Sequence, residues 1–102
     1  MSLIISACSQ TNAIKIIDVR TFEEFSESHV AGAINIDILD EETFIESIIN
    51  FNRNTEIIIY CRSGNRSSQA VEILEHLGFT EVTDAQTLEN AALVTGRTVN
   101  IS

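Results

Sequence analysis

Short apolar runs separated by polar turns recur along the chain, and the spacing of their apolar residues changes from run to run. Residues 14–19 and 56–60 are rich in isoleucine at successive positions, which is typical of strands buried on both faces of a parallel sheet. Shorter apolar runs predict three more strands, at residues 33–36, 81–83 and 97–101.

Apolar residues at helical spacing mark the segments between these strands. The predicted helices cover residues 22–27, 41–49, 67–77 and 85–93. The polar residues placed to cap the first, second and fourth helices are Thr21, Asp40 and Asp84. Ser67 or Ser68 opens the third helix, and Gly78 ends it. Strands that alternate with helices predict an α/β fold, with a mostly parallel central sheet flanked by helices.

Length and charge narrow the class of protein. The chain has 102 residues, with 6 Lys and Arg against 15 Asp and Glu, and so a formal charge of −9. The length fits one domain over residues 1–102 that begins with a short segment, 1–13. The phosphate groups of a nucleic acid repel a surface with this negative charge. No apolar run approaches the ~18 residues of a membrane span. We therefore expect a soluble monomer with no nucleic-acid partner and no membrane span.

The first residues raise the question of export. An apolar run ends in small residues before Cys8, which superficially resembles a lipoprotein cleavage site. Nothing basic precedes this run, and it is shorter than the roughly 7–15 apolar residues of a signal peptide. The compartment therefore stays open between cytoplasm and periplasm. We expect Cys8 to be incidental, since two cysteines are too few for a disulfide scaffold.

The polar loop after residue 60 holds the candidate chemistry. No acidic residue occurs between Glu56 and Glu72, whereas Arg62 and Arg66 both fall inside this window. A loop between a buried strand and a helix can turn several backbone N–H groups inward, and the helix adds the positive end of its dipole. A cysteine in such surroundings ionises readily and becomes a nucleophile, which makes Cys61 the candidate catalytic residue. The alternative is a buried structural cysteine beside solvated arginines.

Five segments along the chain form a further pattern: Ile17-Asp18-Val19-Arg20, Glu24-Phe25, His29-Val30-Ala31-Gly32-Ala33-Ile34-Asn35-Ile36, Tyr60-Cys61-Arg62-Ser63-Gly64-Asn65-Arg66-Ser67 and Leu77-Gly78-Phe79. Together these segments resemble the family of single-domain rhodaneses, which are thiosulfate sulfurtransferases. They occur in the family's order between about residues 14 and 84. The resemblance implies a single rhodanese-like domain.

The resemblance also implies a reaction. The Cys61 thiolate would take the outer sulfur of thiosulfate as a persulfide, release sulfite, and pass the sulfur to cyanide or a thiol. The partners would be a small anionic sulfur donor and a thiol acceptor, with no cofactor. The residues that would hold the anion are Arg62, Ser63, Gly64, Asn65, Arg66 and Ser67. We expect no metal, because the two cysteines, His29 and His76 lack ligand spacing.

Four residues outside the loop are expected to support it. Asp18 and Arg20 lie near the carboxyl edge of the sheet, and Arg20 is placed to pair with Glu24 on the following helix. His29, which resembles the histidine before the family's Gly-Ala pair, is expected to hold its own loop rather than to act as a base.

Two other functions use the same residues. A phosphatase or arsenate reductase has five residues between its cysteine and arginine, whereas four separate Cys61 from Arg66. A non-catalytic rhodanese-like module would bind a partner or sense redox state through Cys61. The segment 84–102 also departs from the family pattern, since Asp84-Ala85-Gln86-Thr87-Leu88-Glu89 stands where rhodaneses usually show a double glycine. The resemblance implies that this segment borders the active-site entrance, so the difference affects substrate preference and access of the acceptor.

Overall fold

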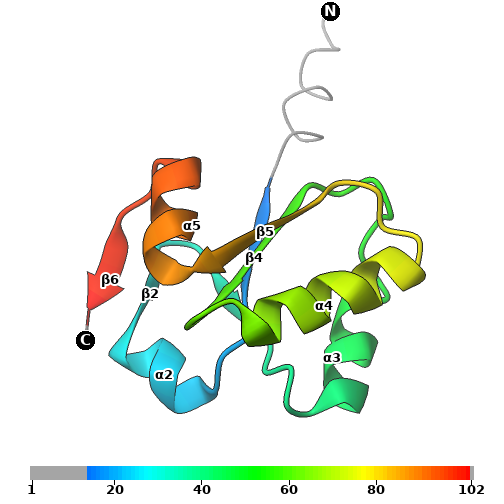
Figure 1. Ribbon diagram of the computed structural model, residues 1–102, viewed down its shortest axis with the longest axis horizontal. Helices are drawn as coiled ribbons and strands as arrows, with labels where there is room; N and C mark the ends of the chain where they lie inside the picture. Colours follow the sequence, from blue (N-terminus) through cyan, green and yellow to red (C-terminus); the bar gives the residue numbers. More distant parts are fainter. Residues whose placement is uncertain (1–13, 102) are drawn as a thin grey trace, which may run out of the picture.

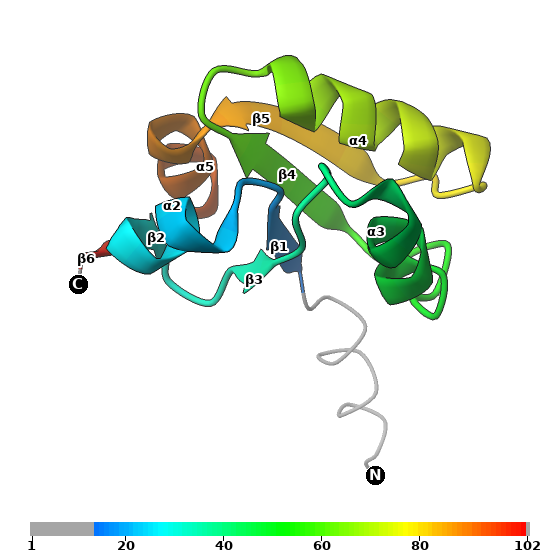
Figure 2. The same cartoon turned by 90° about the horizontal axis from the view of Figure 1, so that it is seen from below.

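The computed structural model describes residues 14–101, so the predicted segment 1–13 with Cys8 lies outside the described residues. Four parallel strands form the central sheet (Figures 1 and 2). Their order across the sheet is β3 (Ile34–Asn35), β1 (Lys15–Asp18), β4 (Ile57–Cys61) and β5 (Val82–Thr87). The predicted α/β class with a parallel sheet is therefore confirmed.

Helices cover both faces of this sheet (Figure 2). They are α2 (Phe22–Glu27), α3 (Glu41–Ile48), α4 (Asn65–His76) and α5 (Leu88–Thr95). Capping by Thr21 and Asp40 occurs as predicted, because each side chain accepts a hydrogen bond from a backbone N–H of the first turn. No helix within residues 14–101 has the length and apolarity needed to cross a membrane.

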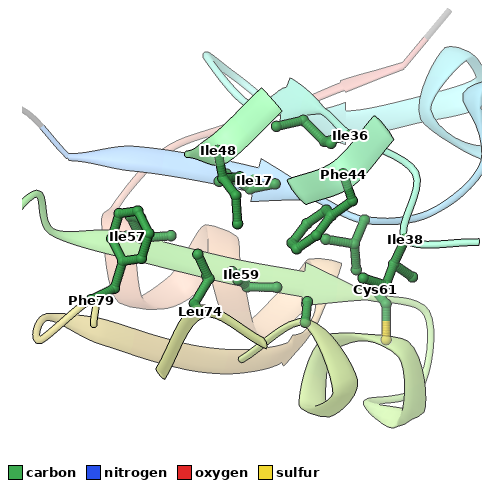
Figure 3. Close-up of a cluster of buried hydrophobic side chains, with 12 residues drawn as sticks. Ile17, Ile36, Ile38, Phe44, Ile48, Ile57, Ile59, Cys61, Leu74 and Phe79 are labelled. Carbon is green, nitrogen blue, oxygen red and sulfur yellow. The ribbon is translucent and has the colours of Figure 1, made fainter. Parts of the chain in front are cut away.

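The core has two halves because successive residues of a strand face opposite sides of the sheet. On one face, Ile57, Ile59 and Cys61 pack with the inner sides of α3 and α4 (Figure 3). On the other face, Ile58 and Tyr60 pack with α5. The most apolar strand of the chain thus carries Cys61 at its last position, at the carboxyl edge of the sheet, where α/β folds place their ligands.

A second sheet was not predicted. The strands β2 (Ser28–Val30) and β6 (Val99–Ile101) pair antiparallel beside α5, separately from the central sheet. Each of these strands has three residues, which are too few to show an alternating pattern of apolar and polar positions. The backbone of β2 finds its hydrogen-bonding partners only in a segment far along the chain, since residue 101 lies opposite residue 28. The strand predicted at residues 97–101 is therefore present in part, and its partner is distant in the sequence.

Two predicted boundaries were wrong, and both lie beside Cys61. Helix α4 begins at Asn65 rather than at Ser67, with Gly64 in the left-handed conformation before it. Strand β5 continues to Thr87, which caps α5, so Asp84 is not a helix cap. The Asp84 carboxylate instead accepts the N–H of Gln86, two residues further on, and this turn lies within the strand.

Candidate active site

Cys61 lies where the core meets the candidate loop. Its side chain is buried, and its sulfur points out of the packed cluster toward the first turn of α4 (Figure 3). The backbone N–H of Gly64 donates to the Cys61 Sγ at 3.0 Å, and the N–H of Ser67 donates at 3.3 Å. Gly64 can bring its amide there because φ is 104°, a conformation that a residue with a Cβ rarely adopts. The loop therefore forms a cradle of backbone donors around the sulfur.

The cradle changes the acidity of Cys61. Burial is the largest single influence, and it opposes ionisation. Hydrogen bonds from Ser67 and from the backbone amides of Gly64 and Ser63 act in the other direction and outweigh it, so the pKa of Cys61 is lowered. The thiolate is consequently accessible at a lower pH than that of an ordinary cysteine, as nucleophilic catalysis requires.

We expect Cys61 to react with iodoacetamide at a pH where Cys8 does not. Although burial opposes ionisation, the hydrogen bonds of the cradle lower the pKa of Cys61 from the ordinary value of a cysteine. Site-resolved alkylation rates across pH, measured by peptide mass spectrometry, provide the comparison within one sample. Identical profiles for the two cysteines would contradict an ionising cradle.

Arg66 projects from the first turn of α4 and is paired with Glu24 of α2. The two guanidinium nitrogens lie 2.8 and 3.2 Å from the two carboxylate oxygens, which is a bidentate contact. The predicted pairing of Arg20 with Glu24 is therefore wrong. The hydrogen bonds to Glu24 raise the pKa of Arg66, and Arg66 also lies near enough to Cys61 for the two charges to interact. This ion pair fastens the start of α4 to α2.

We expect the Glu24–Arg66 pair to stabilise the fold at neutral pH and to lose its effect in acid. Hydrogen bonding from Arg66 lowers the pKa of Glu24 to about 2, against about 4.3 in an unfolded chain. The stabilisation is complete above the unfolded value and is lost as the pH falls toward about 2. In urea unfolding, the difference between the parent and Glu24→Gln should therefore shrink below pH ~4. Glu23→Gln, on the same helix turn, is the matched control, and a pH-independent difference for Glu24→Gln would contradict the assignment.

Arg20 pairs with Asp18 instead, inside the protein. Its Nη2 donates to Asp18 Oδ2 at 2.7 Å, and its backbone N–H donates to Asp18 Oδ1 at 2.9 Å. The same guanidinium donates to the carbonyl of Ser28 at 2.6 Å, and the side-chain amide of Asn35 donates to the carbonyls of Asp18 and Arg20. These contacts tie the ends of β1, β2 and β3 together. Asp18 is thus a positioning residue behind the site.

His29 lies on β2. Its Nδ1–H donates to the carbonyl of Phe25 at 2.8 Å, and its ring stacks on that of Phe25 with 3.8 Å between centroids. The imidazole joins α2 to β2 and does not line the cleft above Cys61.

A cleft of about 300 Å³ opens above Cys61. Its lining residues are Arg20, Ser28, Cys61, Arg62, Leu88 and Glu89. Arg62 is exposed in this cleft, and its side chain has no ion-pair partner among residues 14–101. Sequence reasoning missed Ser28 as a lining residue. Leu88 and Glu89 belong to the divergent segment 84–89, which the resemblance had implied to border the active-site entrance.

The described residues contain no cluster of three His, Cys, Asp or Glu side chains that could hold a metal ion. Of the predicted loop residues, Ser67 is buried against Cys61, whereas Ser63 and Asn65 are exposed at the surface. The site therefore consists of one ionisable sulfur, a set of backbone donors, and an unpaired arginine at the wall of the cleft.

Comparisons with known proteins show which family the chain resembles. Residues 5–86 match the family described as "Rhodanese-like domain". Thiosulfate sulfurtransferase PspE of Escherichia coli is 38% identical over 77 residues, which cover 76% of this chain and 73% of that protein. The chloroplastic thiosulfate sulfurtransferase 16 of Arabidopsis thaliana is 39% identical over 79 residues, which cover 69% of this chain and 66% of that protein. A solved structure described as "rhodanese with anions from E. coli" is similar with a TM-score of 0.71 at 33% identity, covering 88% of this chain and all of the other.

Proposed function

The chain belongs to the family of rhodanese-like domains, and from this premise we propose that it transfers sulfane sulfur through a persulfide on Cys61. The donor is thiosulfate or a similar small anion, and the acceptor is a thiol, or cyanide in an assay. The observation that carries the proposal is the pair of backbone N–H groups at 3.0 and 3.3 Å from the Cys61 Sγ. Such donors stabilise both the thiolate and the negative charge on a transferred sulfur.

The reaction has two displacements at sulfur. In the first, the Cys61 thiolate attacks the outer sulfur of thiosulfate, the sulfur–sulfur bond of thiosulfate breaks, and sulfite leaves with the bonding electron pair. Cys61 then carries a terminal sulfur with a negative charge. In the second, an acceptor thiolate attacks that terminal sulfur, and the new bond forms as the bond to Cys61 breaks. The acceptor leaves as a persulfide, and the Cys61 thiolate returns.

The two arginines of the loop have different roles in this proposal. Arg66 is occupied by Glu24, so its guanidinium fixes the loop and contributes charge from behind the cradle. Arg62 lines the cleft and has no ion-pair partner in the described part of the chain, which leaves its donors available to the anionic end of the substrate. We assign the contact with the donor anion to Arg62 and the positioning of the loop to Arg66. The sequence predicts that both arginines hold the anion, and this proposal keeps that role for Arg62 alone.

The cleft leaves space for an acceptor. Because Cys61 is almost fully buried, only its sulfur can be reached, and the approach passes between Arg62 and the first turn of α5. The volume of about 300 Å³ exceeds what a small inorganic anion needs and accommodates a small organic thiol. This supports a transferase whose second substrate enters by the same opening as the first.

The deciding experiment is intact-protein mass after incubation with thiosulfate. We expect a gain of one sulfur atom, which cyanide then removes as thiocyanate, and no gain in Cys61→Ser under the same conditions. An unchanged parent mass would favour the non-catalytic binding or redox-sensing module. Release of phosphate from an aryl phosphate, without a mass gain, would favour the phosphatase class.

A further inference from the structure

Gln86 has an unusual backbone conformation next to Cys61. It is the only residue other than glycine with a positive φ among residues 14–101, at 71°. This left-handed region suits glycine, and side chains with a Cβ are disfavoured there. Gln86 also stands in the segment where the family pattern has its double glycine. The chain therefore holds a glutamine in a conformation that suits glycine, and neighbouring residues must maintain it.

Two side chains hold this conformation. The pairing of β4 with β5 skips one residue, since Ile59 lies opposite Asp84 and Tyr60 lies opposite Gln86. The extra residue, Ala85, forms a bulge, and its carbonyl accepts a hydrogen bond from the Asn90 amide at 2.9 Å. The Asp84 Oδ1 accepts the N–H of Gln86 at 2.9 Å and closes a turn around the bulge.

The held conformation places Gln86 against the cradle, in contact with both Cys61 and Gly64. Its backbone carbonyl lies 3.5 Å from the Cys61 Sγ and accepts the hydrogen of the thiol. Its side chain covers Gly64, since a Cβ added to that glycine would lie 3.5 Å from the Cβ of Gln86. The sulfur thus has backbone N–H donors and a carbonyl acceptor within hydrogen-bonding distance. Only the neutral thiol can use the acceptor, and only the donors favour the thiolate.

From this geometry we propose that Asp84 is a positioning residue that keeps the Gln86 carbonyl against Cys61, where it restrains ionisation of the thiol. The value of such a restraint follows from the chemistry of thiols. Nucleophilicity falls as a thiol becomes more acidic, and the best attacking thiol has a pKa near the ambient pH. Donors alone would make Cys61 too acidic to attack well, and the carbonyl balances them. The consequence for sulfur transfer rests on the proposed function, whereas the effect on ionisation does not.

Charged groups from several elements also face Cys61. Arg62 on the loop, Arg20 after β1 and Glu89 on α5 share its cleft. Arg66 on α4 interacts with the sulfur while paired with Glu24 on α2, and Asp37, which follows β3, acts on Arg66. Asp84 adds a carboxylate on β5. The test must therefore distinguish the effect of its charge on Cys61 from the effect of its hydrogen bond to Gln86. Substitution of Asp84 by asparagine does this, because the amide oxygen can accept the same N–H without a charge.

The test compares Asp84→Ala with Asp84→Asn by the pH profile of Cys61 alkylation with iodoacetamide, with Cys8 as the internal reference. Asp84→Ala frees the Gln86 carbonyl from the sulfur, so we expect its profile to move to lower pH. A fall of half to one pKa unit raises the thiolate fraction at pH ~6 about threefold to tenfold, and the lower nucleophilicity of the more acidic thiolate offsets part of this gain. The rate should therefore rise about twofold to fourfold. Asp84→Asn should keep the parent profile. Gln86→Gly should also keep it, because glycine adopts the same φ and retains the carbonyl.

The direction of the shift in the alkylation profile distinguishes this proposal from a general loosening of the loop. A loosened loop would lose its N–H donors. The alkylation profile of Cys61 would then shift to higher pH, toward that of free cysteine, which is opposite to the expected shift. Equal shifts of the profile in Asp84→Ala and Asp84→Asn would assign the effect to the charge of Asp84. An unshifted profile in Asp84→Ala would show that the Gln86 carbonyl does not restrain ionisation. Either result overturns the proposal. If Asp84→Ala does not fold, Asp84→Val, which suits a strand and lacks the acceptor, carries the same expectation. Because alkylation needs no sulfur donor, its outcome is independent of the mass test for persulfide formation.

Discussion

Cys61→Ser is expected to reduce thiosulfate:cyanide sulfur transfer to the rate of the uncatalysed mixture. The hydroxyl of serine remains protonated at neutral pH and cannot form the persulfide, whereas the size of the side chain hardly changes. The hydroxyl oxygen of the new serine can accept the hydrogen bonds of the Gly64 and Ser67 amides, so the loop should keep its conformation. Thiocyanate formation measures the activity, and the urea midpoint measures whether the fold survives.

Cys8→Ser is the matched control for this experiment. It removes the second cysteine of the chain and should leave the rate unchanged. Turnover by Cys61→Ser comparable to the parent would contradict a persulfide on Cys61, and loss of activity in Cys8→Ser would require a second cysteine in the mechanism.

Asp18→Ala is expected to lower the free energy of unfolding by about 3–5 kcal/mol, the range for removing one partner of a buried ion pair. The Asp18 side chain is fully buried and that of Arg20 is 8% exposed, so alanine leaves a guanidinium in the interior without its anion. Urea unfolding followed by circular dichroism measures the change. A small domain has only about 5–15 kcal/mol of stability, so the effect is a large share of the total.

The double variant Asp18→Ala with Arg20→Met distinguishes the charge from the packing. Methionine fills part of the arginine volume and removes the unpaired cation, so the double variant should recover part of the stability lost in Asp18→Ala. A loss of less than 1 kcal/mol in Asp18→Ala would show that water or another acceptor compensates Arg20. A double variant less stable than the single one would show that packing by the arginine stem outweighs its charge.

The position of Asp84 shows where local rules reach their limit. An aspartate ahead of a helical pattern is a good N-cap, and the sequence predicted that role. The side chain makes the same type of hydrogen bond, to an N–H two residues on, but within β5. What decides between the two outcomes is the pairing of β5 with β4, because Tyr60 and Cys61 extend the ladder to Gln86 and Thr87. A contact with a strand more than twenty residues away therefore moved the helix start to Leu88.

The sequence by itself determined the features that depend on neighbouring residues. The buried strand β4, the caps Thr21 and Asp40 and the loop after Tyr60 follow from apolar spacing and side chains that bond their own backbone. The cradle also follows, since a strand, a glycine and a helix start within a few residues bring N–H groups to one point. Such features need no partner from a distant segment.

Only the tertiary structure decided which groups meet across the fold. Glu24 lies near Arg20 in the sequence but bonds Arg66, because α2 packs beside the start of α4 while Arg20 turns back to Asp18. The pairing of β2 with β6 and the cleft wall at Glu89 arise in the same way, from segments far apart in the chain. Charge and hydrogen-bonding capacity are local properties of a residue, but the choice of partner depends on which surfaces the packed core brings within a few ångströms. In this protein the candidate nucleophile could be predicted from its neighbours in sequence, whereas the groups that surround it were set by the packing of the sheet and its helices.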